Sequence, residues 1–389
     1  MRIFKLFFEI LIDFFASMFP VQQNKDAKKI LILNYWHLGD YIMLLEAYKE
    51  IRKYFPKHTV FFLSNLEIAK ENKNFDEIID IKLSSFFSEF GMNIRNIIYR
   101  FNMFRKINIK YDYIFNLERH GNDLTTLMIN LKSNNKIGYE QEYIGLKKQI
   151  WKIFSKVYTQ KVNSKILHNT LSMKYLFSQT ITEYKMQEDG YYFPKLENTD
   201  IEQYSLLTNK NYYVICLGSA DKFKNWEIEK FIEFSEKSVT KTENIVLAGS
   251  KEEKILGESF ISRYKGNKNI INLIGETNLK ELTSVIKYAK FYIGNDTGAT
   301  HLAISLKTPS IAIVSGATFN CCLPYFEDNK QNLQKLNNLS VYKKMDCFLC
   351  WYKCKYLNSG SKNYKCLEEI SVENVLNQFN ILKEYCNID

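Results

Sequence analysis

Short apolar runs alternate with amphipathic stretches along most of this chain, and this alternation restricts its fold more than any other feature. Residues 30–35 form a nearly uninterrupted apolar run, and the polar turn after it leads into a helical pattern that Pro56 ends. Apolar runs of this length are typical of parallel strands that are buried on both faces. Strands that alternate with helices form βαβ units, so the pattern predicts an α/β fold with parallel sheets. Further runs lie at residues 59–63, 78–81 and 111–117.

The alternation restarts in the second half of the chain, which predicts a second domain. A chain of 389 residues is too long for a single compact core. We expect one Rossmann-like domain over residues 28–205 and another over residues 206–389. Residues 142–190 show weak helical periodicity, and we expect helices there that close the first domain. The strands expected in the second domain lie at residues 212–217, 244–248, 269–273, 291–293 and 310–314.

Residues 1–27 are interpreted as an amphipathic helix of about 20 residues and a polar linker. Apolar residues fill most of the helix, and acidic residues in its middle argue against a bilayer-spanning segment or a signal peptide. Two interpretations stay open: the helix contacts the inner membrane face or a partner subunit, or it packs on the protein's own body. Its polar residues recur every three or four positions and so share one narrow stripe: Arg2, Lys5, Glu9, Asp13 and Ser17.

The charge of the chain predicts an anionic partner. The formal net charge is +10 at pH 7, which favours phosphates or an acidic membrane surface. Lysine is scattered along the chain instead of forming a basic stripe, so we expect no nucleic acid partner. A hydrophobic fraction of 46% with 25% charged residues is typical of a globular protein and excludes a disordered one.

Residues 291–309 contain the strongest candidate for an anion site. A short apolar strand ends at the turn Gly-Asn-Asp-Thr-Gly, residues 294–298, and an apolar stretch with helical spacing follows. The first amide groups of such a helix have no intrahelical partner and lie at the positive end of its dipole, where phosphate binds. Asp296 or Thr297 could cap this helix, and His301 lies about one turn inside it. The alternative is an ordinary capped junction between a strand and a helix.

A second turn with the composition of a phosphate site runs from Gly218 to Trp226. It combines small residues with two lysines, which suits a diphosphate because the backbone can approach closely and an ammonium group neutralises charge. Solvated lysines on a loop are the alternative. The chain contains neither G-x-G-x-x-G nor G-x-x-x-x-G-K-S/T, so a dinucleotide fingerprint and a P-loop have no support.

Asp40 follows the first strand, at the end of the sheet where ligands of open α/β folds bind. Two interpretations of this carboxylate stay open. It can cap the helix that follows, which contributes about 1 kcal/mol, or it can accept a proton from an acceptor hydroxyl. A later strand is followed in the same way by Arg119 and His120.

Three stretches, in this order, resemble glycosyltransferase family 9, the lipopolysaccharide heptosyltransferases. They are ILILNYWHLGD at residues 30–40, the turn at residues 218–226 with its Lys-Asn-Trp, and GNDTGATHLAISLKTPSIAIVSG from residue 294. The resemblance covers residues 28–140 and 212–376. It implies a GT-B fold, in which two Rossmann-like domains face a central cleft, and an inverting, metal-independent transfer of a heptose from a nucleotide-activated donor. The chain contains no D-x-D pair, which agrees with charge neutralisation by lysine and a helix N-terminus.

The resemblance also implies roles for single residues, with the first domain as the acceptor side and the second as the donor side. Asp40 takes the place of the general base on the acceptor hydroxyl, and Lys224 that of the group holding the donor phosphates or sugar. Glu253 takes the place of a ribose ligand. The other residues expected at the donor are Ser219, Asp296, Thr297, Gly298 and His301, and those expected on the acceptor side are His37, Arg119 and His120.

The function implied by the resemblance is that of an enzyme that takes an ADP-heptose-like donor and needs no cofactor for catalysis. The acceptor is expected to be a hydroxyl of a lipopolysaccharide core or of another surface glycan. We expect the enzyme in the cytoplasm, peripherally at the inner face of the cytoplasmic membrane. Two alternatives stay open: a non-catalytic protein that binds a sugar nucleotide on the same fold, and a glycosyltransferase that modifies a protein.

Four of the eight cysteines lie close together near the C-terminus, in the order Cys-x2-Cys-x3-Cys-x11-Cys. This spacing suits a tetrahedral metal, and we expect a structural zinc or iron ion there. Reduced, partly buried thiols are the alternative, and disulfides are not expected in the cytosol. The residues are Cys347, Cys350, Cys354 and Cys366.

Overall fold

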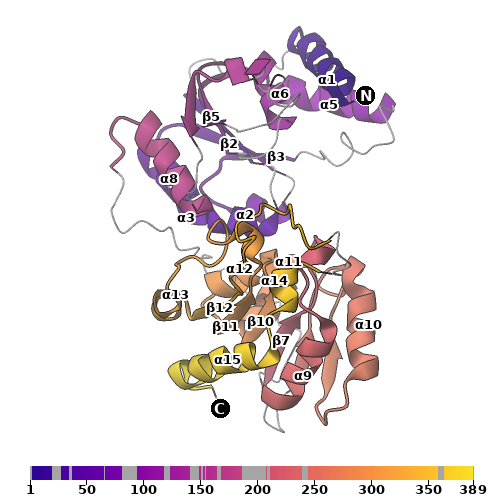
Figure 1. The fold of residues 1–389 in the computed structure, drawn as a ribbon. Coiled ribbons are helices and arrows are strands. Elements are labelled where there is room, and N and C mark those ends of the chain that lie inside the picture. Colours follow the sequence, from indigo (N-terminus) through magenta and orange to yellow (C-terminus); the bar gives the residue numbers. More distant parts are fainter. Residues whose placement is uncertain are drawn as a thin grey trace. The chain divides into compact units, whose positions relative to one another are not determined.

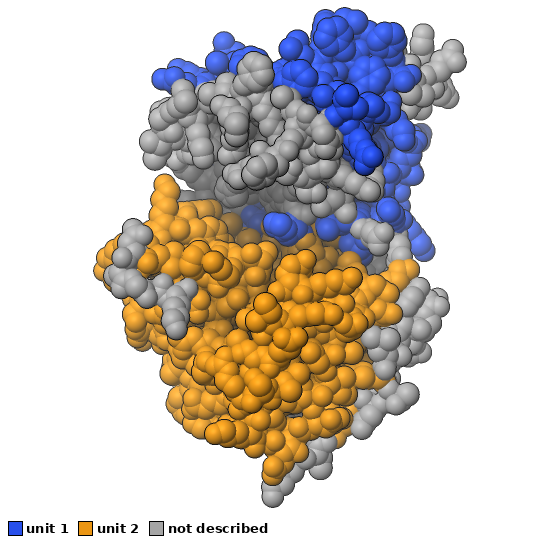
Figure 2. Space-filling view, turned by 90° about the vertical axis from the view of Figure 1, so that its right-hand side faces the viewer, with its two compact units in different colours: residues 1–37, 47–190 blue, residues 38–46, 191–389 orange. Residues whose placement is uncertain are grey.

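The fold comes from a computed structural model, and its described part divides into two compact units, which Figure 2 colours separately. Unit 1 comprises residues 1–37 and 47–190, and unit 2 comprises residues 38–46 and 191–389. Each unit has its own six-stranded parallel sheet, which confirms the predicted α/β fold. The structure describes residues 2–19, 28–34, 37–64, 66–80, 94–117, 123–140, 149, 152–153, 155–163, 168–185, 207, 211–238, 244–357 and 363–388.

The sheet of unit 1 has the strand order β3-β2-β1-β4-β5-β6 (Figure 1). This is the order of the doubly wound Rossmann fold. The apolar run predicted at residues 30–35 forms the central strand β1, whose Leu33 pairs with Leu63 of β2 and Asn116 of β4. The strands are β1 (Lys29–Leu33), β2 (Thr59–Ser64), β3 (Glu77–Asp80), β4 (Lys110–Asn116), β5 (Lys132–Glu140) and β6 (Gln160–Asn163).

The helices of unit 1 complete its hydrophobic core. Phe104 and Ile107 of α5 and Leu127 of α6 are buried in one cluster with Leu31 and Leu33 of the sheet. The N-terminal helix α1 packs against α5 and α6 (Figure 1). The helices are α1 (Arg2–Ser17), α3 (Leu45–Tyr54), α5 (Ile94–Ile107), α6 (Asp123–Asn130) and α8 (Asn169–Thr180).

The strands β5 and β6 are not predicted by the sequence patterns. β5 opens with polar residues of low strand propensity. Tertiary hydrogen bonds hold it: Asn135 Nδ2 donates to Asp112 O at 2.9 Å, and Lys136 Nζ donates to Met128 O at 2.6 Å. β6 lies within residues 142–190, where only helices are expected. The single helix expected after β1 is divided into α2 (Leu38–Met43) and α3.

The sheet of unit 2 repeats the same topology, with the strand order β12-β11-β10-β7-β8-β9. All five strands predicted for this half of the chain are confirmed, and β12 is an additional edge strand. The strands are β7 (Tyr212–Cys216), β8 (Asn244–Leu247), β9 (Ile270–Asn272), β10 (Tyr292–Asn295), β11 (Ser310–Ile313) and β12 (Asn338–Val341).

Among the helices of unit 2, α11, α13 and α15 begin at side-chain caps. Asn278 and Glu281 form a capping box at the start of α11, in which each side chain accepts the backbone N–H of the other residue. Trp226 is buried in the core, and its Nε1 donates to Ile370 O at 2.9 Å. The helices are α9 (Ile228–Ser238), α10 (Lys254–Arg263), α11 (Leu279–Lys287), α12 (Gly298–Ser305), α13 (Asn329–Leu336), α14 (Lys365–Glu368) and α15 (Val372–Cys386).

The strand order of unit 2 reverses between β7 and β10. From β7 the chain continues to β8 and β9 on one side, and it returns to β10 on the other side. The loops that leave the carboxyl ends of such neighbouring strands form a crevice, the usual ligand site of an open α/β sheet. In unit 2 these loops are the two turns with phosphate-site composition, residues 218–226 and 294–298.

Candidate functional site

Asn295 joins the two turns at the carboxyl ends of β7 and β10. Its buried side chain accepts the N–H of Trp226 at 2.8 Å and donates to the carbonyl of Leu217 at 2.8 Å. Thr300 of α12 donates its hydroxyl to the Asn295 carbonyl. The asparagine of the Asn-Asp pair therefore fixes the backbone of both turns, which positions the aspartate that follows it.

The carboxylate of Asp296 lies between a lysine and a histidine. Lys224 Nζ is 3.4 Å from Asp296 Oδ2, and His301 Nε2 is 3.6 Å from Asp296 Oδ1. The three side chains are largely buried, with 9% of Asp296, 16% of Lys224 and 3% of His301 exposed. Lys224 comes from the short 3-10 turn η4 (Lys222–Lys224), which Asp221 caps by accepting the N–H of Phe223 at 3.0 Å. The structure thus brings together three residues that the sequence predicts for one site.

Opposing effects set the pKa values of this ion pair. Burial alone would raise the pKa of Asp296, but the charge of Lys224 and the hydrogen bond from His301 hold it well below its usual range. Burial disfavours the charged form of Lys224, yet Asp296 and Tyr352 raise the pKa of its ammonium group. Both groups are therefore ionised at neutral pH, and the site contains a buried, fully charged ammonium group.

The N-termini of α2 and α12 meet in unit 2. A Cβ atom on Gly39 would lie 2.7 Å from His301 Cδ2, and one on Gly298 would lie 3.0 Å from Leu38 Cβ. Side chains at these two positions would push the helices apart, so glycine permits the close approach. The first turns of both helices consequently lie next to each other.

Asp40 is half-buried in the first turn of α2, as its third residue, and is therefore not the N-cap. It lies near Tyr325, whose pKa is raised by burial and further by Cys322, Asp296 and Asp40. The hydroxyl of Tyr325 is 3.1 Å from Nδ1 of His301. Asp40 and Asp296 are thus both close to the tyrosine–histidine pair.

Tyr325, Cys322 and Tyr352 are site residues that the sequence patterns miss. The ring of Tyr352 comes from the cysteine-rich segment, and Lys224 Nζ lies 4.9 Å from its centroid. The hydroxyl of Tyr352 is 3.0 Å from Thr318 Oγ1. None of the three belongs to a periodic pattern or a turn motif, and only the closeness of Tyr352 to the cysteine motif draws attention to it.

Glu253 lies beside the glycine turns that follow β7 and β8. A Cβ atom on Gly218 would lie 2.6 Å from Glu253 Cδ, and one on Gly249 would overlap the carboxylate. Ser250 Oγ donates to Glu253 Oε1 at 3.2 Å, and burial raises the pKa of Glu253. The neighbouring Glu252 is exposed. Of the two adjacent glutamates, only Glu253 is placed at the strand ends.

The remaining residues predicted at the donor lie on the two turns. Ser219 is on the turn after β7, and its hydroxyl donates to Asp221 O at 2.5 Å. Thr297 precedes α12 in an extended conformation, and Gly298 is the first residue of that helix. All three are therefore at the edge of the sheet where Asp296 and Lys224 pair.

Of the three residues predicted on the acceptor side, His37 belongs to the part of the chain that the structure describes. His37 is exposed and belongs to unit 1. Arg119 and His120 lie outside the described residues.

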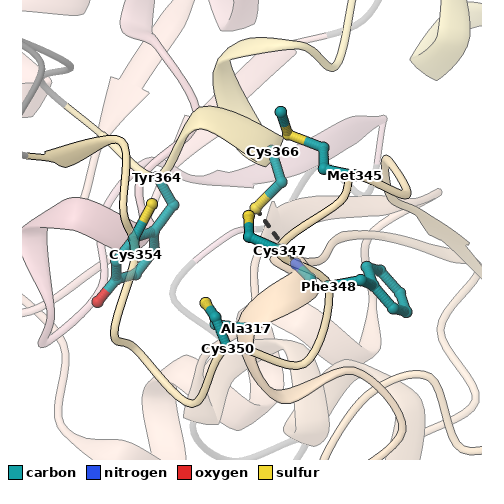
Figure 3. Close-up of a pocket in the computed structure, with 9 residues that line it drawn as sticks. Ala317, Met345, Cys347, Phe348, Cys350, Cys354, Tyr364 and Cys366 are labelled. Carbon is teal, nitrogen blue, oxygen red and sulfur yellow. Dashed lines mark hydrogen bonds between the residues drawn. The ribbon is translucent and has the colours of Figure 1, made fainter.

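The four cysteines predicted as metal ligands line one small pocket (Figure 3). Burial raises the pKa of the Cys347 thiol, and Cys350 and Cys354 raise it further. The sulfur of Cys366 accepts the N–H of Gly316 at 3.3 Å. Within the described residues, however, no group of three or more His, Cys, Asp or Glu side chains is arranged to hold a metal ion. This arrangement of the thiols therefore does not support the predicted metal site.

The two parallel sheets with their helices form the GT-B fold, which solved structures of heptosyltransferases share. The chain belongs to glycosyltransferase family 9 (heptosyltransferase), whose family model matches residues 100–351. The family predicted from the sequence motifs is thereby confirmed, and the protein is an enzyme.

Individual relatives cover most of the chain. Lipooligosaccharide heptosyltransferase 2 of Campylobacter jejuni is 23% identical over 272 residues, which are 64% of this chain and 81% of the relative. The structure of Escherichia coli ADP-heptose LPS heptosyltransferase II matches with a TM-score of 0.63 and 15% identity, over 91% of this chain and 98% of the other. The iron-containing dodecameric glycosyltransferase TibC from enterotoxigenic E. coli matches with a TM-score of 0.51 and 12% identity, over 93% and 78%. At these identities the two structures establish a shared fold.

Proposed function

We propose that this enzyme moves a heptose, or a similar sugar, from a nucleotide-sugar donor to a hydroxyl of a lipopolysaccharide core or another surface glycan. The transfer inverts the anomeric carbon and uses no metal ion. The names of the heptosyltransferase relatives, one of them named for ADP-heptose, support this donor class. The observation that carries the proposal is the buried pair of Lys224 and Asp296 at the switch point of the second sheet, beside the N-terminus of α12.

The donor diphosphate binds between Lys224 and the first turn of α12. The ammonium group and the positive N-terminal end of the helix dipole neutralise the charge that grows on the leaving diphosphate. Asp296 holds the lysine in place, with His301 on the other side of its carboxylate. Glu253, half-buried at the neighbouring strand end, accepts hydrogen bonds from the ribose hydroxyls.

Asp40 acts as the general base. As the acceptor oxygen forms its bond to the anomeric carbon, its proton passes to the Asp40 carboxylate, and the bond to the diphosphate oxygen breaks on the opposite face. A single displacement of this kind inverts the anomeric carbon. The close packing of α2 on α12, which Gly39 and Gly298 permit, supports this assignment because it puts the base next to the helix proposed to bind phosphate.

The enzyme works in the cytoplasm at the inner membrane face, in this proposal, because a lipopolysaccharide acceptor carries its saccharide on a lipid. The heptosyltransferase relatives named for lipooligosaccharide and lipopolysaccharide support such an acceptor. His37, Arg119 and His120 are the residues we propose for contacts with its saccharide.

A donor screen tests the proposed function. ADP-heptose at about 100 times its Kd is expected to stabilise the protein by about 2.7 kcal/mol, because it binds only the folded chain. The shift in Tm is measured with ADP-, GDP- and UDP-sugars in parallel, which also identifies the nucleotide. The donor site is refuted if none of these sugars raises Tm.

Lys224→Ala is expected to weaken donor binding about 10–100-fold, since a charge-assisted hydrogen bond contributes roughly 1.5–3 kcal/mol. Lys222→Ala is the matched control, because Lys222 is an exposed lysine of the same turn, and it is expected to bind the donor as the parent does. Donor affinity is measured by titration calorimetry and not by a shift in Tm. Loss of Lys224 also leaves Asp296 buried without its ammonium partner, which lowers Tm even without donor. Equal affinities for the two variants would remove Lys224 from the site.

We further propose that the four cysteines hold a structural zinc or iron ion when their four sulfur atoms move close enough to bind one ion. Their spacing in the sequence and the iron-containing TibC of the same fold support this proposal. Elemental analysis of protein purified without chelator is expected to find about one metal ion per chain. Cys350→Ser is expected to lose the ion, whereas Cys386→Ser, at the end of α15, keeps it. A metal-free parent protein refutes the site.

A further inference from the structure

The helix α1 presents an apolar face to solvent. Phe15 and Phe19 are 55% and 57% exposed. Ile94 and Ile98 continue this face on α5, because Phe101 shares their side of that helix and its ring centroid lies 6.3 Å from that of Phe19. A surface helix of a globular protein normally turns its apolar face toward the core. We name this region the α1–α5 surface, and its residues are Phe7, Leu11, Phe14, Phe15, Met18, Phe19, Ile94 and Ile98.

The acidic residues of α1 face the protein instead of water. Glu9 is 4% exposed and Asp13 is fully buried. Both pair with the buried Arg100 of α5: its Nη2 lies 2.6 Å from Asp13 Oδ2, and its Nη1 lies 3.3 Å from Glu9 Oε2. Buried carboxylates are stable only beside such a partner. The ion cluster therefore fixes which face of α1 is inside and turns the phenylalanines outward.

Hydrogen bonds hold α1 in this orientation. The carbonyl of Ile10 accepts from Asn130 Nδ2 of α6 at 3.0 Å. Near the end of α1, backbone carbonyls accept from Asn108 at 3.1 Å and from Arg105 at 2.6 Å. The apolar face is thus preorganised, and docking requires no rearrangement of the helix.

The exposed charge of the two helices is cationic. α5 contains no acidic residue, and the acids of α1 are the buried Glu9 and Asp13. Arg95 and Lys106, near the two ends of α5, are exposed. An anionic lipid surface complements this charge. A second copy of the chain across a two-fold axis would instead bring the same cations together, which is unfavourable.

We propose that the α1–α5 surface docks in the interface of an anionic bilayer, with its apolar side chains among the acyl chains and its cations at the headgroups. α1 has 16 residues, and no helix among the described ranges is long and apolar enough to cross a membrane, so α1 lies in the plane of the interface. The purpose of this docking, access to a lipid-linked acceptor, rests on the proposed function.

Flotation of the full chain with vesicles of phosphatidylethanolamine and phosphatidylglycerol tests the docking. Leu11→Gln with Phe15→Gln removes two exposed apolar side chains one turn apart and is expected to weaken vesicle binding about 100-fold. Ile255→Gln with Ile261→Gln is the matched control, because it changes two exposed isoleucines of α10 in unit 2, and it is expected to float as the parent does. Vesicles of phosphatidylcholine alone are expected to bind the parent more weakly.

The proposal is overturned if the parent does not float, or if the Leu11 and Phe15 double variant floats as well as the parent. An oligomer that this variant dissociates, seen by sedimentation without vesicle binding, would assign the surface to a second copy of the chain. Vesicle binding needs neither donor nor acceptor, and sugar transfer is measured separately on a soluble saccharide acceptor. A protein that binds vesicles but transfers no sugar refutes the proposed function alone.

Discussion

Asp40→Asn is expected to lower the rate of sugar transfer by about 10²–10⁴-fold, the range for loss of a general base. An amide of the same size cannot accept the proton of the acceptor hydroxyl. Asp40 is the third residue of α2 and not its N-cap, so the substitution does not remove an N-cap, and the interaction of this carboxylate with the helix dipole contributes about 1 kcal/mol or less. Initial rates of nucleotide release with donor and acceptor measure the effect, and donor affinity is expected to stay as in the parent.

Glu46→Gln is the matched control for this prediction. Glu46 is a half-buried carboxylate in the first turn of α3, six positions after Asp40 along the chain. It has no role in the proposed reaction, and its neutralisation is expected to leave the transfer rate nearly unchanged. Full activity in the Asp40 variant would show that its carboxylate is structural and would favour a different base.

The strands that the sequence predicts are those whose side chains are apolar on both faces. β1, β7 and β11 are buried along their whole lengths, and their largely apolar composition predicts this burial. β5 has only residues 137–139 in the core, and its position depends on hydrogen bonds to Asp112 and Met128. Contacts of this kind come from other parts of the chain, so no local pattern reveals them.

The candidate site is predictable to the extent that strand order determines it. Turns after neighbouring parallel strands at a switch point must converge, and Lys224 and Asp296 lie on two such turns. Tyr325 and Tyr352 lie on loops, and they reach His301 and Lys224 only through tertiary packing. Their place in the site therefore requires the three-dimensional structure.

The orientation of α1 shows a different limit of sequence patterns. Helical spacing correctly groups Glu9 and Asp13 on one side of the helix, but it does not say which side is buried. Their partner Arg100 follows 87 residues after Asp13 in the chain. Charged residues are rarely buried without a partner, so only the position of Arg100 in the fold shows that the side with Glu9 and Asp13 is the buried one.

Arg100→Met is expected to lower the free energy of unfolding by about 3–5 kcal/mol, because it leaves two buried carboxylates without their cation. The loss is expected to begin with detachment of α1, which hydrogen exchange in residues 2–17 reports. Arg95→Met is the matched control: Arg95 is an exposed arginine on the same helix, and its loss is expected to change stability by about 0.5 kcal/mol or less. Equal effects of the two variants would contradict the role of the ion cluster.

The pH dependence of the packing of α1 on unit 1 distinguishes Asp13 from an ordinary salt-bridged carboxylate. Burial raises the pKa of Asp13 from 3.8 to about 6, even though Arg100 lowers it. The folded protein therefore binds this proton more tightly than the unfolded chain does. The packing of α1 on unit 1 is consequently strengthened as pH falls through about 6, and it changes little below about 4.

Asp13→Asn removes this dependence and keeps Arg100 paired with Glu9. The rate of hydrogen exchange in α1 is measured for the parent and for Asp13→Asn at each pH. The ratio of the parent rate to the variant rate is expected to fall between pH 7 and pH 5. Faster relative exchange on acidification would mean that the ionised pair, and not the buried neutral acid, is the more stable form.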